Sequence, residues 1–182
     1  MNEPKLSSTL PGYCDEWYPW KEIIAFFPIV ENPTLLEVGC FHGKSTAYWA
    51  EHLPQWRIHS VDTFPGYDGQ EKRLRCTGEE QLRNYKKVLD TYSNVSYTKG
   101  DFSKLVMKKP WDNPTVFFYD GDHSFDATLN ALLTMRDTPV IVVDDYEEVW
   151  PEVTKAVNLF QRETGRAMEV LGAERHGVAV FG

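Results

Sequence analysis

The chain has 182 residues, 42% hydrophobic and 14% aromatic, which suits a single globular domain with a sizeable buried core. Its formal net charge of −8 opposes association with phosphate backbones, so we expect no nucleic-acid partner. The first residues lack the features of a secretory signal and no apolar run approaches the ~20 residues that span a bilayer, so we expect a cytoplasmic protein without a membrane partner.

The N-terminal region carries two different patterns. The first twelve residues are polar, contain two prolines, and are expected to form a mobile arm. Residues 17–30 place apolar side chains at helical spacing and predict a helix. Its aromatic residues Trp17, Tyr18 and Trp20 fit a core, with an acceptor pocket as the alternative. We therefore expect an N-terminal arm and cap helix over residues 1–33, followed by the main domain over residues 34–182.

From residue 34 onward, short apolar runs alternate with helical patterns, which predicts a mostly parallel sheet with helices on both faces. The last two runs are joined by too few residues for a crossover helix, so they are expected to pair antiparallel. The expected strands are residues 34–38, 57–61, 95–97, 115–119, 140–143, 167–171 and 177–181. The expected helices are residues 46–53, 79–92, 125–133 and 153–160, the last preceded by Pro151 at a first helical position.

Residues 64–78 form an unusually long connection that is rich in glycine and charge. Loops of this length in compact domains are often lids over a functional site, and plain disorder is the alternative.

A turn with two glycines, Gly39 and Gly43, follows the first expected strand and opens the first helix. A phosphate-binding P-loop requires four residues between its glycines, whereas this turn has three. The dinucleotide fingerprint also fails, because Cys40 and Phe41 stand where its second glycine would be. A plain tight turn without a ligand is the remaining alternative.

Acidic residues at the ends of the next two strands favour a ligand at this turn. Asp62 ends the second strand, 23 residues after Gly39, where a carboxylate can accept hydrogen bonds from ribose hydroxyls. Asp101 follows the third strand, where it can accept from an adenine amino group while the ring of Phe102 lies against the base. A single acidic residue of this kind is more often a helix cap, but the group together favours binding.

These segments resemble the cofactor half of the class I methyltransferases. The resemblance lies in residues 37–45, 60–66 and 100–102, and in the antiparallel pair at the C-terminus. It implies an α/β, Rossmann-like class I methyltransferase fold with a mostly parallel seven-stranded sheet, and S-adenosyl-L-methionine as the cofactor. By motif, Glu37 and Gly39 would lie near its methionine end, Asp62 near the ribose, and Asp101 with Phe102 near the adenine. The full set of implied cofactor residues is Glu37, Gly39, Cys40, Phe41, Gly43, Ser45, Asp62, Thr63, Asp101, Phe102 and Asp120.

A second acidic group follows the fourth and fifth expected strands. The fourth strand leads into Asp120, Asp122 and His123, and the fifth into Asp144 and Asp145. Neighbouring parallel strands would bring these carboxylates together, and a divalent cation would remove their repulsion. Hard oxygen ligands favour Mg²⁺, Ca²⁺ or Mn²⁺ over zinc, and such a cation could bind a substrate hydroxyl and lower its pKa. The alternative is an ordinary helix start and a turn.

Residues 120–122, 140–146 and 156–160 are similar to the macrocin O-methyltransferase group, which is Mg²⁺-dependent and methylates sugar hydroxyls. The resemblance implies that Asp120, Asp144 and Asp145 bind the metal and that Asp122 is the base. His123 is the alternative base, because its ordinary pKa lies nearer neutrality. This chain has only about 33 residues ahead of the glycine turn, fewer than those enzymes, which leaves the acceptor open.

The sequence therefore predicts a metal-dependent O-methyltransferase that acts on a small hydroxylated acceptor. Two alternatives remain at this stage. One is metal-independent methylation of a nitrogen or carboxyl acceptor, and the other is a non-catalytic module that binds S-adenosylmethionine. Whether the protein is a monomer or a homodimer is not determined by the sequence.

Overall fold

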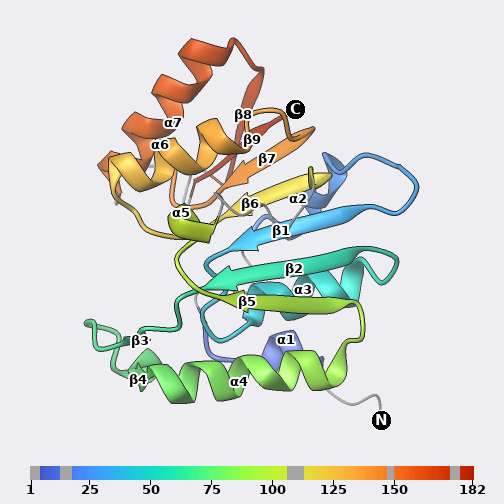
Figure 1. The fold of residues 1–182 in the computed structure, drawn as a ribbon, viewed down its shortest axis with the longest axis vertical. Coiled ribbons are helices and arrows are strands. Elements are labelled where there is room, and N and C mark those ends of the chain that lie inside the picture. Colours follow the sequence, from blue (N-terminus) through green and yellow to red (C-terminus); the bar gives the residue numbers. More distant parts are fainter. Residues whose placement is uncertain (1–4, 13–17, 106–112, 147–149, 173–176) are drawn as a thin grey trace.

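A single seven-stranded sheet forms the centre of the protein (Figure 1). The computed structural model describes residues 5–12, 18–105, 113–146, 150–172 and 177–182. The strands of the sheet are β1 Thr34–Val38, β2 Arg57–Asp62, β5 Val95–Lys99, β6 Val116–Tyr119, β7 Val140–Val143, β8 Met168–Leu171 and β9 Val178–Phe181. Their order across the sheet is β5-β2-β1-β6-β7-β9-β8.

The pairing of the strands confirms the predicted fold. Neighbours from β5 through β2, β1 and β6 to β7 are parallel, whereas β9 runs antiparallel to both β7 and β8. The strand order reverses between β1 and β6, which is the position where ligands bind in open α/β sheets. Both strands end at the same edge, in register through Val38 and Tyr119.

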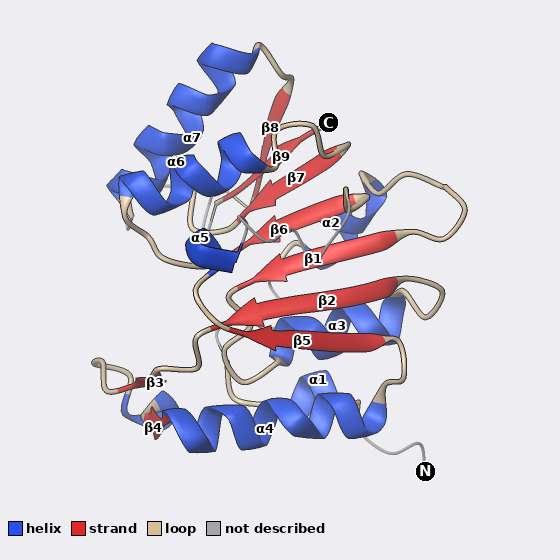
Figure 2. Ribbon diagram, viewed as in Figure 1, coloured by secondary structure: helices blue, strands red, loops and turns tan. Residues whose placement is uncertain are grey.

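Helices cover both faces of the sheet (Figure 2). Successive side chains of a strand point to opposite faces, and both faces of the central strands are apolar, so each face is buried against helices. On one face, Leu35 and Phe118 pack with Trp49 of α3, which spans Lys44–His52. On the other face, Leu36 and Phe117 belong to a cluster that also contains residues of α6, Phe125–Thr134, and of α7, Pro151–Thr164.

The helices α6 and α7 begin as the sequence predicts. The hydroxyl of Ser124 accepts a hydrogen bond from the backbone N–H of Ala127 at the start of α6. Pro151 occupies the first turn of α7, where its missing N–H is not needed. The helix α7 ends at Gly165, whose φ of 67° is the left-handed conformation that glycine adopts without strain.

The connection from residue 64 to residue 78 is folded and does not form a disordered loop. It contains a short antiparallel hairpin, β3 Gly66–Tyr67 and β4 Cys76–Thr77, with the 3-10 turn η1 Lys72–Leu74 between them. The helix α4, Gly78–Thr91, follows directly. Thr77 and Glu80 form a reciprocal capping box at its start, so the end of the hairpin is tied to a stable helix.

The prediction of a mobile N-terminal arm is wrong for residues 5–12. Leu6–Thr9 form the short helix α1, and the carboxylate of Glu51 on α3 accepts hydrogen bonds from the backbone N–H and hydroxyl of Ser7 at 3.0 and 2.5 Å. Leu10 is buried beside Ala47 and Val88. Polar segments order when neighbouring elements satisfy their backbone groups, which a local pattern does not reveal.

The second N-terminal helix is shorter than predicted. The helix α2 spans Trp20–Ala25, and both Trp20 and Ile23 lie in the core with Trp49. Trp20 is therefore a core residue, and Tyr18 is buried against it. Tyr18 also lines the large pocket at the carboxyl edge of the sheet that is described below. The prediction for Trp17 falls outside the described residues.

Among the described residues, no helix is both long and apolar enough to cross a membrane.

Candidate active site

A large pocket opens at the carboxyl edge of the parallel strands. Its volume is about 1420 Å³, and its walls come from the glycine turn, the ends of β2, β5, β6 and β7, and α6. Ligand pockets commonly enclose about 300–1,000 Å³, so this one has room for a cofactor and a second small molecule.

The glycine turn is shaped by the close approach of two backbone segments. Gly39 has a φ of 83°, and a Cβ atom at this position would lie 1.8 Å from the carbonyl oxygen of Asp120. Gly43 has a φ of 86° and faces the side chains of Tyr85 and Val88 on α4. Both glycines are therefore required by geometry, and both positions of the predicted turn are confirmed.

Asp62 binds the backbone of the glycine turn. Its Oδ2 accepts hydrogen bonds from the N–H groups of Cys40 and Phe41, each at 2.9 Å, and its Oδ1 accepts from the N–H of Phe64 at 2.6 Å. The carboxylate also lines the main pocket together with Thr63. The carboxylate is thus held at the end of β2, where the sequence predicts contact with the ribose of a nucleoside.

Asp101 lies on the same pocket wall and also begins a helix. Its Oδ1 accepts from the backbone N–H and hydroxyl of Ser103, at the start of α5, Phe102–Leu105, and its Oδ2 is 2.9 Å from Lys104 Nζ. Phe102 is 8% exposed and stacks on Phe117, with ring centroids 5.6 Å apart. Both predicted adenine residues line the pocket, although most of the Phe102 ring lies in the core.

Glu37 is fully buried beneath the turn and does not line the pocket. Its Oε2 accepts hydrogen bonds from the hydroxyls of Thr46 and Ser60. Burial raises the pKa of Glu37, against the opposing effect of hydrogen bonds from Ser45, Ser60 and Thr46. Of the other predicted turn residues, Gly39, Cys40, Phe41 and Ser45 line the main pocket and Gly43 does not.

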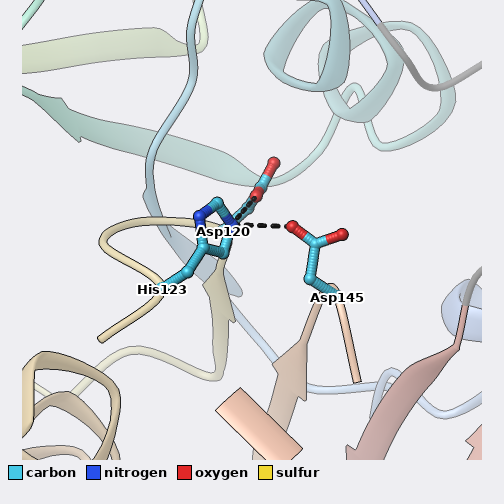
Figure 3. A group of neighbouring side chains, drawn as sticks. All are labelled: Asp120, His123 and Asp145. Atoms are coloured by element: carbon cyan, nitrogen blue, oxygen red, sulfur yellow. Dashed lines mark ion pairs between the residues drawn. The ribbon is translucent and has the colours of Figure 1, made fainter. Parts of the chain in front are cut away.

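The ends of β6 and β7 bring three predicted residues together. Figure 3 shows His123 between the carboxylates of Asp120 and Asp145. His123 Nε2 lies 2.7 Å from Asp145 Oδ2 and 3.8 Å from Asp120 Oδ1. One candidate ligand atom from each of the three lies within 4.8 Å of the others. The predicted convergence of the two strand ends, His123 included, is therefore present. His123 also offers a candidate ligand atom, whereas the sequence assigned the metal to carboxylates alone.

The cluster has unusual protonation. Burial, then repulsion from Asp144 and Asp145, raises the pKa of Asp120 well above its ordinary range. Burial alone would lower the pKa of His123, but the hydrogen bonds and charges of Asp120 and Asp145 outweigh it and raise that pKa to about 10. Without a cation, His123 is therefore the positive charge between two carboxyl groups.

Two other predicted acidic residues have different surroundings. Asp122 is exposed in the turn ahead of α6, where its Oδ1 accepts from the backbone N–H of the cap residue Ser124 at 2.8 Å. Hydrogen bonds from Ser124 lower the pKa of Asp122, which makes it a weak base. Asp144 is 5% exposed and lines the pocket, beside Asp145.

Trp150 is a pocket residue that the sequence reasoning did not identify. Its ring stacks on His123 with centroids 4.2 Å apart and an interplanar angle of 12°, while 41% of the residue is exposed. Tyr119, whose hydroxyl donates to the Asp122 carbonyl at 2.8 Å, is another. The sequence marks Trp150 only as the residue before Pro151 at the start of α7, which predicts a helix boundary and no pocket role.

The comparison with protein families identifies the domain. A family model described as "Methyltransferase domain" matches residues 36–146, from the first strand of the sheet through Tyr146 after β7. This is more than half of the chain, and it includes the glycine turn, Asp62 and the three-residue cluster. The chain belongs to this methyltransferase family.

Solved structures share the fold of this methyltransferase at low sequence identity. Human N-acetylserotonin methyltransferase, solved in complex with SAM, is 10% identical with a TM-score of 0.58, over 90% of this chain and 51% of that one. An O-methyltransferase family protein from Burkholderia thailandensis is 9% identical with a TM-score of 0.60, over 90% of this chain and 55% of that one.

Shorter proteins match over most of their length. Precorrin-6y C5,15-methyltransferase from Geobacter metallireducens is 14% identical with a TM-score of 0.61, over 89% of this chain and 85% of that one. The present methyltransferase thus spans about half the length of the first two structures. At these identities the likeness shows the fold alone. No curated protein sequence matched the chain.

Proposed function

We propose that this methyltransferase uses S-adenosylmethionine to methylate a hydroxyl group of a small acceptor, with a divalent cation held by Asp120 and Asp145. The observation that carries the proposal is one continuous pocket whose walls include both Asp62 beside the glycine turn and the Asp120–His123–Asp145 cluster. A nucleoside cofactor and a hydroxyl acceptor can therefore occupy the same cavity.

The turn side of the pocket fits S-adenosylmethionine. Gly39 lines the pocket, and the carboxylate of Asp62 is placed at the end of β2 where it can accept from ribose hydroxyls. Asp101 and the edge of Phe102 form the wall next along the sheet, as expected for the adenine. Crystals of related folds such as the human enzyme contain SAM, which supports the same ligand here.

The other side of the pocket fits a hard divalent cation. Asp120 and Asp145 present carboxylate oxygens within one cluster, and Asp144 lies beside them on the pocket wall. Burial and mutual repulsion raise the pKa of Asp120, and a cation would relieve that repulsion. When bound, such a cation would supply Lewis-acid polarisation of an acceptor hydroxyl and lower its pKa.

His123 is the residue that we propose as the base. It lies inside the cluster at 2.7 Å from Asp145. A cation on Asp120 and Asp145 would neutralise the carboxylates that raise the pKa of His123, so the ring would become neutral and able to accept a proton. The carboxylate of Asp122 instead accepts from Ser124 and has a lowered pKa. The acceptor oxygen would attack the methyl carbon of the sulfonium, the carbon–sulfur bond would break with its electrons going to sulfur, and His123 would take the hydroxyl proton. The products are a methyl ether and S-adenosylhomocysteine.

The test measures methyl transfer from labelled S-adenosylmethionine to a panel of phenols, catechols and sugars, with Mg²⁺ and with EDTA. We expect turnover in Mg²⁺ and its loss in EDTA. Asp145→Ala should lose metal affinity and recover part of its turnover at high Mg²⁺, because one hard ligand is removed. Asp137→Ala is the matched control and should behave as the wild type, because this carboxylate lies in the turn after α6 with a 92% exposed side chain.

Undiminished turnover in EDTA would show that methyl transfer needs no metal. The cluster would then be the ion pairs of His123 with Asp120 and Asp145. His123→Ala should lower turnover about 10²–10⁴-fold at every Mg²⁺ concentration, whereas Asp122→Asn should change it far less. A larger loss of turnover in Asp122→Asn than in His123→Ala would identify Asp122 as the base.

A further inference from the structure

A second, smaller hollow lies beside the main pocket and is lined by three arginines. Its volume is about 280 Å³, and Arg73, Arg75 and Arg83 lie on its walls. Pro11 and His42 line both this hollow and the main pocket. Three guanidinium groups around one small space are unexpected in a chain with a net charge of −8.

The charges around the hollow remain positive when their partners are counted. Among the described residues on its walls, Glu80 is the one carboxylate. Its Oε2 accepts from the backbone N–H and hydroxyl of Thr77 at 2.8 and 3.2 Å. Its approach to Arg83 is long, at 3.8 Å. Arg73 pairs with Glu71 at 3.3 Å, and Arg75 Nε donates to the carbonyl of Gly69 at 2.9 Å. Each contact engages one of the five N–H donors of a guanidinium.

His42 adds a neutral donor to the hollow. Lys87 Nζ donates to Asn84 Oδ1 at 2.8 Å, which leaves the amide nitrogen of Asn84 to donate to His42 Nδ1 at 3.1 Å. With Nδ1 as the acceptor, the neutral ring carries its proton on Nε2. Burial lowers the pKa of His42, which keeps the ring in this neutral form.

We propose that this hollow, lined by Arg73, Arg75, Arg83, His42 and Asn84, is an anion subsite that takes a phosphate or carboxylate group. Three arginines lie on its walls with the carboxylate of Glu80, and guanidinium groups match the planar or tetrahedral oxygens of these anions. The hollow is small for a ligand pocket and has room for one charged group. The shared walls of Pro11 and His42 allow a molecule in the main pocket to carry that group.

Assigning the group to the methyl acceptor rests on the proposed function, but anion binding does not. The first experiment therefore measures inorganic phosphate binding to the full chain by ³¹P NMR, without cofactor or acceptor, at constant ionic strength. We expect Kd to rise about tenfold or more in Arg83→Gln and in Arg75→Gln, since each removes charge-assisted hydrogen bonds. Arg83→Lys, which keeps the charge and loses the fork, should lie between them and the wild type.

Arg162→Gln is the matched control. Arg162 lies on α7 with a 74% exposed side chain and an acidic neighbour at 3.6 Å, and Arg83 has a 70% exposed side chain and an acidic neighbour at 3.8 Å. Thermal unfolding of each variant checks that it folds. Equal phosphate affinity in the wild type, Arg83→Gln and Arg162→Gln would overturn the subsite.

A second arm identifies the source of the anion. Two acceptors that differ only by a phosphate or carboxylate group are compared with Arg83→Gln. A KM that rises about tenfold for the anionic acceptor alone places the group on the acceptor, and equal KM values place a free anion in the hollow. Phosphate binding with no methyl transfer to any acceptor would contradict the proposed function and leave the subsite standing.

Discussion

The carboxylate of Asp62 accepts hydrogen bonds from three backbone N–H groups, two of them in the glycine turn. Asp101 similarly accepts from Ser103 at the start of α5. At the level of single residues, the helix-cap or turn role and the ligand role are therefore not exclusive. A carboxylate held by backbone donors has a fixed position, which is what a ligand site requires.

We predict that Asp62→Ala has two separable effects. S-adenosylmethionine affinity should weaken by roughly 1–3 kcal/mol through loss of charge-assisted hydrogen bonds. The free energy of unfolding should also fall by about 1–2 kcal/mol, because the N–H groups of Cys40 and Phe41 lose their acceptor. Calorimetry and urea denaturation measure the two, with Asp90→Ala on the exposed face of α4 as the control. A variant with unchanged affinity would remove Asp62 from the binding site.

The pKa of His123 gives the metal-free protein a definite dependence on pH. That pKa rises to about 10 in the folded state, from an unfolded value of roughly 6.5. The stabilisation is therefore complete below pH ~6.5 and is lost as the pH rises through ~10. The difference in unfolding free energy between wild type and His123→Gln should shrink between pH 7 and pH 10. A difference that stays constant over this range would contradict the ion pairs with Asp120 and Asp145.

At the level of elements, the buried strands were predictable because each is a short apolar run bounded by a turn residue. Val140–Val143 is an example, since four consecutive β-branched residues are typical of a strand that is buried on both faces. The helix α1 and the strands of the β3–β4 hairpin were not predictable. They have four and two residues, and contacts such as Ser7 with Glu51 come from elsewhere in the chain.

The residues of the site follow the same division. Asp120 and Asp145 were predictable from strand ends that meet at one edge. The ion pairs of His123 and its stacking on Trp150 depend on rotamers and on the start of α7, which one sequence does not specify. The macrocin group, the metal and the acceptor remain predictions.

Two glycine substitutions, one in the glycine turn and one at the end of α7, test why glycine is needed at position 39. Gly39→Ala should lower the free energy of unfolding by about 3 kcal/mol or more, because the new Cβ would lie 1.8 Å from the carbonyl of Asp120 and φ is 83°. Gly165→Ala has a similar positive φ of 67° but meets nothing within 4 Å, so it should cost only about 1 kcal/mol. Urea denaturation of both variants gives the comparison. Equal losses would mean that backbone strain alone, and not the approach of Asp120, requires glycine at position 39.

At the scale of the whole molecule, the parallel sheet places every candidate site residue on one edge. The order reversal between β1 and β6 opens the pocket there, with the glycine turn on one side and the cluster of Asp120, His123 and Asp145 on the other. The net charge of −8 remains unfavourable for nucleic acid, and the arginine hollow is too small for a phosphate backbone. We therefore propose a small molecule, and not nucleic acid, as the methyl acceptor.

The most direct test of the proposed cofactor is a calorimetric titration of the full chain with S-adenosylmethionine, and separately with NAD, in the presence of Mg²⁺. We predict one saturable site for S-adenosylmethionine, competition by S-adenosylhomocysteine, and no binding of NAD. Binding of NAD with no heat from S-adenosylmethionine would contradict this prediction, because the pocket beside the glycine turn would then belong to a different cofactor.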